Sequence, residues 1–507
     1  MVLTRSSRVL ERWRGNGMLA LLGLALIKLA AQIAMAGRYG FHRDELYYIA
    51  AGRHLGFGYV DYPPLTAVMA RLSTVVFGHS LVGLRVWPAL AGAAVVVLAG
   101  LIARELGGGR LAQVFAGLLV VCSPIFLGSN SMLQTVSFDQ LTWAVCLYLI
   151  ARILARGGSP RLWLGLGVAF GIGLETKYTI LLLGLGLVVG LVVTAQRRSL
   201  GTPWPWLAGL VAAALLAPNL AWQVAHGWPT IEFLGKHDAA MAAENPPTRF
   251  LYEQLLLIGF AAVPLWVSGL VDLLRRPRFR ALGVVAVVVL AGLLLQRAKS
   301  YYAGPIYPLL FAAGAVSFER FTRRPATTRW RSWLGVRTVG TALVVSALVA
   351  LPFSLPVLPM RTMAHLGLGD LRADYAEMIG WPQLVREVAG AFDTLPPAER
   401  ATARVLAGNY GEAGAVDWFG PALGLPSAIS GHDTYWFWRP RQQPSGPLVT
   451  LGYQEAQLNI LCGSLRKVGA VTNPIGIDNE EQGGPIFICR DLRMPLESWP
   501  SFRRFVS

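Results

Sequence analysis

The sequence predicts a mainly α-helical, polytopic membrane protein of about 11 transmembrane helices, with a small extracytoplasmic α/β domain at its C-terminal end. Of the 507 residues, 54% are hydrophobic and only 14% are charged. A soluble chain would carry about 25% charged residues. The mean hydropathy is +0.49, and apolar runs recur until about residue 356. These observations exclude a disordered chain and a small disulfide scaffold.

Each apolar run is a candidate membrane span because a helix needs about 20 mostly apolar residues to cross the hydrocarbon layer. The run 162–174 is short, so a tilted or half-depth element is expected there. The predicted spans are 17–36, 82–103, 111–127, 138–155, 162–174, 178–195, 204–222, 251–271, 281–296, 303–318 and 336–355.

The net charge of +17 predicts orientation rather than nucleic-acid binding, because the basic residues lie between apolar runs. One alternating set of loops holds 21 Lys and Arg residues and the other holds 9. Positively charged loops stay in the cytoplasm. The chain is therefore expected in the cytoplasmic (inner) membrane, with its N-terminus inside and everything after about residue 356 outside.

The start of the chain admits a second interpretation. Basic residues, the apolar run 17–27 and Ala34-Met35-Ala36 resemble a secretory signal with its cleavage site. A retained first helix is the preferred interpretation, and N-terminal sequencing of the mature protein separates the two.

Composition divides the chain into a membrane module, residues 1–356, and an outer domain, residues 357–507. The first outer loop, 37–81, is too long to be a simple connector. The outer domain is charged and punctuated by Pro and Gly. Its short apolar strands are predicted at 405–407, 448–451 and 486–488, with helices after Tyr410 and Tyr453.

Cysteines are sparse, and no zinc-binding spacing occurs. Cys462 and Cys489 both fall in the outer domain, where oxidation is permitted. A bridge between them is one of two open alternatives, free thiols being the other.

The first outer loop begins with the richest chemistry, Phe41-His42-Arg43-Asp44-Glu45-Leu46-Tyr47-Tyr48. Carboxylates close to hydrocarbon are costly and tend to mark function. Asp44 is favoured as a general base or as a group that orients an acceptor hydroxyl. For Glu45, catalysis and a helix-capping role are weighed equally.

Other candidates lie at the predicted outer interface. Lys177, and the cluster of Arg297, Lys299, Tyr301 and Tyr302, combine cations with aromatic rings. Such a set suits a lipid-borne phosphate and a sugar face. The alternative is snorkelling bases in an aromatic belt.

Three more residues are candidates for the acceptor or the cavity. Asp139 opens the fourth predicted span on the outside, as a helix cap or a cavity acid. Asp61 and Tyr62 precede Pro63-Pro64-Leu65 in the first outer loop.

Taken together, these motifs resemble the C-type, membrane-embedded glycosyltransferases, and most of all glycosyltransferase family 39. That branch includes protein mannosyltransferases, aminoarabinose transferases and rhizobial lipopolysaccharide-core transferases. The Asp-Glu pair after the first helix, followed by Tyr-Tyr and Pro-Pro-Leu, is the most specific element. The other matching segments are Ser137-Phe138-Asp139, Thr176-Lys177-Tyr178 and Lys299-Ser300-Tyr301-Tyr302.

The resemblance implies an inverting transferase that takes a sugar from a polyprenyl-phosphate carrier on the extracytoplasmic face. Asp44 matches the family's catalytic carboxylate. Lys177, Lys299, Tyr301 and Tyr302 match the residues that hold the donor phosphate. Many relatives have His before the Pro pair, where this chain has Tyr62, which puts a metal or acceptor role for that segment in doubt.

Several properties stay open at this point. Some C-type enzymes require a divalent metal ion and others do not. The acceptor could be a glycolipid, an envelope polysaccharide or a protein, and the oligomeric state does not follow from the residues. The rival functions are a flippase or transporter of lipid-linked sugars and a non-catalytic partner in envelope assembly. Neither explains a 150-residue outer domain or the Asp44 motif as well.

Overall fold

The computed structural model describes residues 17–156, 159–323, 335–473 and 475–505. It divides into two compact units. The first unit comprises Met1–Ala36, Arg85–Trp222 and Asp238–Leu355, and the second comprises Gly37–Leu84, Gln223–His237 and Pro356–Ser507. The second unit thus combines the first outer loop with the C-terminal residues. The division of the chain at residue 356 into a membrane module and an outer domain stays a prediction.

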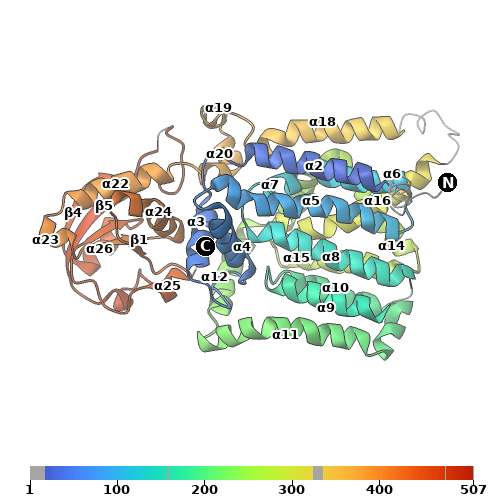
Figure 1. Cartoon of the computed structure of the whole chain (residues 1–507), viewed down its shortest axis with the longest axis horizontal. Coiled ribbons are helices and arrows are strands. Elements are labelled where there is room, and N and C mark those ends of the chain that lie inside the picture. Colours follow the sequence, from blue (N-terminus) through green and yellow to red (C-terminus); the bar gives the residue numbers. More distant parts are fainter. Residues whose placement is uncertain (1–16, 157–158, 324–334, 474, 506–507) are drawn as a thin grey trace, which may run out of the picture. The chain divides into compact units, whose positions relative to one another are not determined.

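The first unit is a bundle of apolar helices that run alongside one another (Figure 1). Direct packing joins α14 to α16, α10 to α15, α8 to α9 and α2 to α6. The longer helices are α2 (Met18–Met35), α5 (Leu81–Glu105), α6 (Arg110–Cys122), α8 (Thr135–Arg156), α9 (Pro160–Leu174), α10 (Ile180–Val192), α11 (Trp204–Ala225), α13 (Pro247–Ile258), α14 (Val263–Arg275), α15 (Arg280–Leu295), α16 (Tyr307–Thr322) and α18 (Val336–Ser354). The short ones are α7 (Pro124–Ser129), η1 (Ala195–Gly201), η2 (Phe260–Ala262) and η3 (Ser300–Ile306).

Among the described residues, five helices are long and apolar enough to cross a membrane, or up to seven if two bent pairs each count as one span. The pair α13 with residues 260–275 bends by 94°. Helix α18 leaves Leu348 and Val349 exposed, as a lipid-facing helix does. The prediction of a mainly α, multi-pass membrane protein is confirmed, and the count of eleven spans stays a prediction.

The second unit contains a five-stranded mixed sheet in the order β2-β1-β3-β5-β4. Its strands are β1 (Arg404–Ala407), β2 (Ala428–Ile429), β3 (Leu448–Leu451), β4 (Cys462–Ala470) and β5 (Pro485–Leu492). Strand β1 is parallel to β2 and β3, whereas β5 is antiparallel to β3 and β4. The small C-terminal α/β domain is therefore confirmed. Strands β1, β3 and β5 lie at the predicted apolar runs, whereas β2 and β4 were not predicted.

Helices of the second unit come from three separate stretches of the chain. The N-terminal ones are α3 (Arg43–Arg53) and α4 (Leu65–Phe77), and α12 (Pro229–Glu244) begins in this unit. The others are α19 (Met360–His365), α20 (Leu368–Leu371), α21 (Ala373–Ala376), α22 (Trp381–Asp393), α23 (Pro397–Arg400), α24 (Tyr410–Phe419), η4 (Gly420–Leu423), α25 (Tyr435–Trp438), α26 (Glu455–Leu461) and η5 (Leu496–Ser498). Helix α24 connects the parallel strands β1 and β2 and packs on α3. This contact positions the first outer loop.

A disulfide joins Cys462, the first residue of β4, to Cys489 in β5, with the sulfur atoms 2.02 Å apart. It closes a loop of 27 residues at the edge of the sheet. Both cysteines belong to the apolar cluster on the face of the sheet that includes Trp499 and Phe502.

Candidate active site

Helix α3 starts with a capping box that fixes the acidic pair. His42 is the N-cap, and its Nδ1 accepts a hydrogen bond from the backbone N–H of Asp44 at 3.2 Å. The carboxylate of Glu45 accepts one from the backbone N–H of His42 at 2.9 Å. Each bond satisfies a donor that the first turn of a helix otherwise leaves unpaired.

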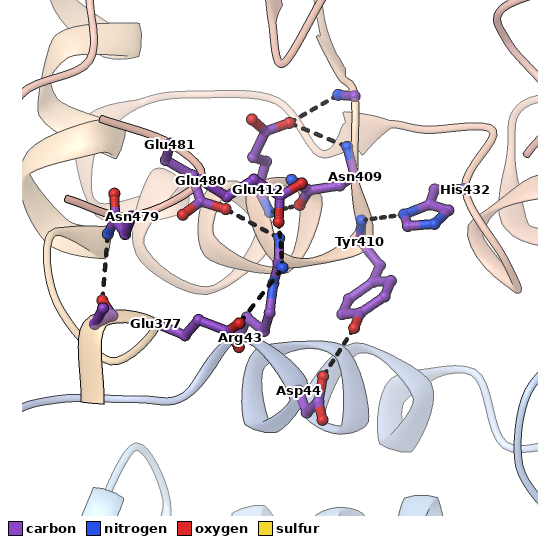
Figure 2. A network of polar contacts seen from close by, with 12 residues as sticks. Arg43, Asp44, Glu377, Asn409, Tyr410, Glu412, His432, Asn479, Glu480 and Glu481 are labelled. Carbon is purple, nitrogen blue, oxygen red and sulfur yellow. Dashed lines mark hydrogen bonds and ion pairs between the residues drawn. The ribbon is translucent and has the colours of Figure 1, made fainter. Parts of the chain in front are cut away.

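Glu45 therefore lies inside the protein with 0% of its surface exposed, in a capping role. The geometry corresponds to the capping alternative that the sequence left open for this residue. Asp44 differs, because 33% of its side chain is exposed and its carboxylate points toward Tyr410 (Figure 2).

The Asp44 carboxylate is held by a tyrosine from the far end of the chain (Figure 2). Tyr410, the first residue of α24, donates its hydroxyl to Asp44 Oδ1 at 2.9 Å. The N-cap residue Asn409 and Glu412 form a second capping box, which positions Tyr410. The other oxygen, Asp44 Oδ2, lies 3.9 Å from His42 Nδ1. One carboxylate oxygen is thus fixed by Tyr410, whereas the other lies at the longer distance from His42.

A second carboxylate, Asp61, is held in the same way. Its Oδ1 accepts a hydrogen bond from the Tyr47 hydroxyl at 2.8 Å. Burial raises the pKa of Asp61 to about 7, although the Tyr47 hydrogen bond opposes the shift, and the negative charge of Asp44 raises it further. A proton on Asp61 near neutral pH reduces the negative charge beside Asp44.

Stacked tyrosines connect the two carboxylates. The rings of Tyr47 and Tyr410 stack with centroids 4.6 Å apart. Tyr62 packs edge-on against Tyr47 at 5.5 Å and is 3% exposed. Its hydroxyl is buried without a hydrogen-bond partner in the described part of the chain. Such a group is costly unless a ligand or water completes it, so Tyr62 is a candidate substrate contact.

Arg43 fixes α3 from its other side through an ionic network (Figure 2). It pairs with Glu480, with Glu481 at 3.0 Å and with Glu377 at 3.9 Å. Its guanidinium also lies 5.6 Å from the centre of the Tyr410 ring. Charge-assisted bonds of this kind are stronger than neutral ones, so the network orients both Asp44 and its tyrosine.

The first unit brings part of the predicted donor cluster together. The Lys177 ammonium lies 4.0 Å from the centre of the Tyr302 ring and 5.4 Å from that of Tyr301. This cation–π geometry places a positive charge in an aromatic surround, between α9 and α10. Asp139 is buried near the start of α8, where its Oδ2 accepts a hydrogen bond from Thr179 at 3.1 Å.

The remaining members of that cluster lie on the connection from α15 to α16. Lys299 is half-buried as the N-cap of η3. Arg297 is exposed and has a left-handed backbone, with φ of 51°. No group of three or more His, Cys, Asp or Glu side chains is arranged to hold a metal ion in the described residues.

Two functional candidates were not singled out from the sequence. Tyr410 belongs to Gly408–Ala415, a segment whose pattern predicts only a strand–turn–helix. The sequence contains no signal for Thr434, whose Oγ1 lies 2.7 Å from the Tyr47 hydroxyl. Tyr47 could be noticed because it lies close to the acidic pair in the sequence. In contrast, nothing in the sequence indicates that Asp44 contacts Tyr410, which is 366 positions away.

Known proteins resemble this chain in sequence and in fold. Residues 61–222 match the family model described as dolichyl-phosphate-mannose-protein mannosyltransferase. A curated relative, the polyprenol-phosphate-mannose–protein mannosyltransferase of Mycolicibacterium smegmatis (strain MKD8), is 27% identical over 175 residues, which are 30% of this chain and 34% of that protein. The chain thus spans about a third of the length of that relative.

Solved structures cover nearly the whole chain. ArnT from Cupriavidus metallidurans in the apo state matches with a TM-score of 0.60 and 16% identity, over 93% of this chain and 97% of that chain. The structure of the same protein bound to undecaprenyl phosphate matches with a TM-score of 0.56, 15% identity and the same coverage. The fold of the chain is therefore that of these ArnT structures. In sequence, residues 61–222 resemble that mannosyltransferase family, in line with the resemblance that the motifs indicated.

Proposed function

We propose that this protein is an inverting glycosyltransferase that moves a sugar from a polyprenyl-phosphate donor to an acceptor on the extracytoplasmic face of the inner membrane. The observation that carries the proposal is Asp44. Asp44 lies in the first turn of α3, and its carboxylate is partly exposed. Tyr410 fixes one of the two carboxylate oxygens. A positioned, partly exposed carboxylate is what general-base catalysis on an acceptor hydroxyl requires.

The mechanism is a direct displacement at the anomeric carbon. Asp44 orients the acceptor hydroxyl and takes up its proton as the oxygen attacks the sugar. The bond to the lipid phosphate breaks on the opposite face, which inverts the configuration. Because phosphate is already a good leaving group, the protein mainly supplies position and positive charge.

In this proposal the donor phosphate is held by the cluster of the first unit. Lys177 supplies the cation, and Tyr301 and Tyr302 surround it. Lys299 and Arg297 add positive charge on the neighbouring connection. Asp61 and Tyr62 contact the acceptor, Asp139 lines the cavity, and Glu45 caps α3.

The names of related proteins support the donor class. The curated relative is named for polyprenol-phosphate-mannose, and one ArnT structure is described as bound to undecaprenyl phosphate. The acceptor class is wider: a glycolipid, an envelope polysaccharide or a protein. The outward orientation of the second unit rests on the excess of basic residues in alternate loops.

The test is sugar transfer by the full-length protein reconstituted in lipid vesicles. Radiolabelled polyprenyl-phosphate sugars serve as donors, and membranes from cells without the gene supply the acceptor. The wild type should transfer label, and Asp44→Asn should be about 100-fold slower or worse, the range of a lost general base. Equal transfer by both proteins would end the assignment of Asp44. Movement of the donor across the vesicle without transfer by the wild type would instead indicate a flippase.

A further inference from the structure

The second unit contains a pocket of about 430 Å³ that is separate from the two carboxylates. Arg53 and His54, at the C-terminal end of α3, line one side. Arg404 of β1, and Tyr435 and Trp438 of α25, line the others. The volume is in the range of small-molecule sites, and Arg53 and His54 are exposed, so the pocket opens to solvent.

The pocket carries an excess of positive charge. Arg53 donates to the backbone carbonyl of Asp417 and Arg404 to that of Ala403, each at 2.9 Å. Neither guanidinium forms an ion pair with a carboxylate in the part of the chain that the structure describes. The third arginine of the pocket, Arg439, is already neutralised by an ion pair at 2.7 Å with Glu497. Two guanidinium groups therefore remain to bind an anion.

The one carboxylate that lines the pocket does not offset this charge fully. Asp417 is occupied at both oxygens, by the N–H of Ala428 and the hydroxyl of Tyr435, each at 2.9 Å. Burial also raises its pKa, although the hydrogen bonds and the positive charge of Arg53 oppose this shift. Arginine is the residue best suited to phosphate and carboxylate groups because its planar fork donates two parallel hydrogen bonds.

An aromatic surface adjoins the arginines. The imidazole of His54 stacks on the Trp438 ring with centroids 4.9 Å apart and planes 18° apart. Tyr435 meets Trp438 edge-on at 5.0 Å. Burial and the charge of Arg53 lower the pKa of His54, so its ring is neutral at pH 7 and can donate and accept hydrogen bonds. The exposed His54 ring and the partly exposed Trp438 ring are the aromatic surface that the C–H face of a sugar ring can contact.

We infer that this pocket binds a sugar that carries a phosphate or carboxylate group, as a part of the acceptor distant from the attacking hydroxyl. The inference rests on the proposed transferase function. The pocket adjoins the site, because the rings of Tyr435 and Trp438 pack against the ring of Tyr47, which binds Asp61, with centroids 6.2 and 6.1 Å apart. One acceptor can therefore contact both places only if it extends beyond a single sugar.

Binding is measured on the detergent-solubilised full chain by saturation-transfer NMR and tryptophan fluorescence. The probes are glucose 1-phosphate and glucuronate, which distinguish the two anions, with glucose and inorganic phosphate as single-feature controls. Either anionic sugar should bind the wild type more tightly than glucose or phosphate alone. Arg53→Gln and Arg404→Ala should each weaken it about tenfold, as the loss of one charge-assisted contact implies. Trp438→Ala should remove the advantage over inorganic phosphate.

The matched control is Arg386→Gln, an exposed arginine of α22 whose guanidinium binds Gln383 at 2.7 Å. It should bind the probes as the wild type does. Arg53 is the safer variant because its side chain is exposed, and melting temperatures identify any variant that fails to fold. Equal probe binding by Arg53→Gln and Arg386→Gln, or no preference for anionic sugars in the wild type, would overturn the inference.

Transfer kinetics separate this inference from the proposed function. Arg53→Gln should raise the acceptor KM about tenfold and leave the donor KM and the saturated kcat unchanged. If Asp44→Asn abolishes transfer while Arg53→Gln leaves the acceptor KM unchanged, only the pocket assignment fails. If anionic sugars bind as expected but Asp44→Asn transfers sugar normally, the proposed mechanism fails instead.

Discussion

Replacing Tyr410 with phenylalanine isolates one hydrogen bond of the site. The variant removes the hydroxyl that donates to Asp44 Oδ1 at 2.9 Å. It keeps the ring, and so the stacking on Tyr47 at 4.6 Å. The carboxylate then loses its restraint without losing its neighbours.

The magnitude follows from the chemistry of that bond. A hydrogen bond to a charged group contributes about 1.5–3 kcal/mol. If the bond orients Asp44 in the transition state, Tyr410→Phe lowers kcat/KM roughly 10- to 150-fold. Because Tyr410 acts through Asp44, the loss should appear in kcat, with the donor KM unchanged.

The assay is transfer from a polyprenyl-phosphate sugar in vesicles, beside a control of the same kind. Tyr453 is also a buried tyrosine of the second unit, and its hydroxyl donates to the backbone carbonyl of Ala407 at 3.4 Å. Tyr453→Phe should transfer sugar at nearly the wild-type rate. A Tyr410→Phe protein as active as Tyr453→Phe would refute the positioning role of Tyr410.

Four further predictions test other parts of the molecule. Glu45→Gln should keep most transfer activity, because glutamine also completes a capping box; a loss as large as that of Asp44→Asn would make Glu45 catalytic. Burial raises the pKa of Asp61 from 3.8 to about 7 in the folded protein. The contribution of this group to the free energy of unfolding is therefore fully present below pH 3.8 and is lost as the pH rises to about 7. The melting temperature of the wild type relative to Asp61→Asn should therefore fall across that range, and a constant difference would contradict the shift. Lys177→Gln should raise the donor KM about tenfold without changing the acceptor KM, and an unchanged donor KM would remove Lys177 from the donor site. Replacing Cys462 and Cys489 by serine should lower the free energy of unfolding by about 3 kcal/mol in denaturant titrations of the oxidised protein, whereas an unchanged midpoint would mean that the bridge does not form.

Much of the fold is predictable because membrane spans and short strands have local signals. Apolar runs identify helices such as α5 and α11, since a bilayer requires length and hydrophobicity within one segment. The strand 448–451 is recognisable in the same way. The bend between α13 and α14 is not, because a single apolar run from 251 to 271 does not show where the backbone turns.

The site was predictable only where its chemistry is local. Asp44 stands out because a charge beside an apolar helix is unusual. Only the structure separates the two alternatives for Glu45, since a capping box and a catalytic pair look alike in a sequence. The Tyr410 contact with Asp44 and the pocket lined by Arg53 and Arg404 both form between the first outer loop and the C-terminal residues. A single sequence contains no signal for pairing across such a distance.

The contact between Asp44 and Tyr410 also has a consequence for biogenesis. At translation rates of about 5–20 residues per second, the 366 residues between them take on the order of 20–70 s to synthesise. During that interval α3 is already made, but α24, its packing partner, does not yet exist. The Asp44 carboxylate therefore acquires its Tyr410 hydrogen bond only after α24 has emerged. A chain that stops after α18 would retain every apolar helix of the first unit and still lack Tyr410, so correct membrane insertion would not imply activity.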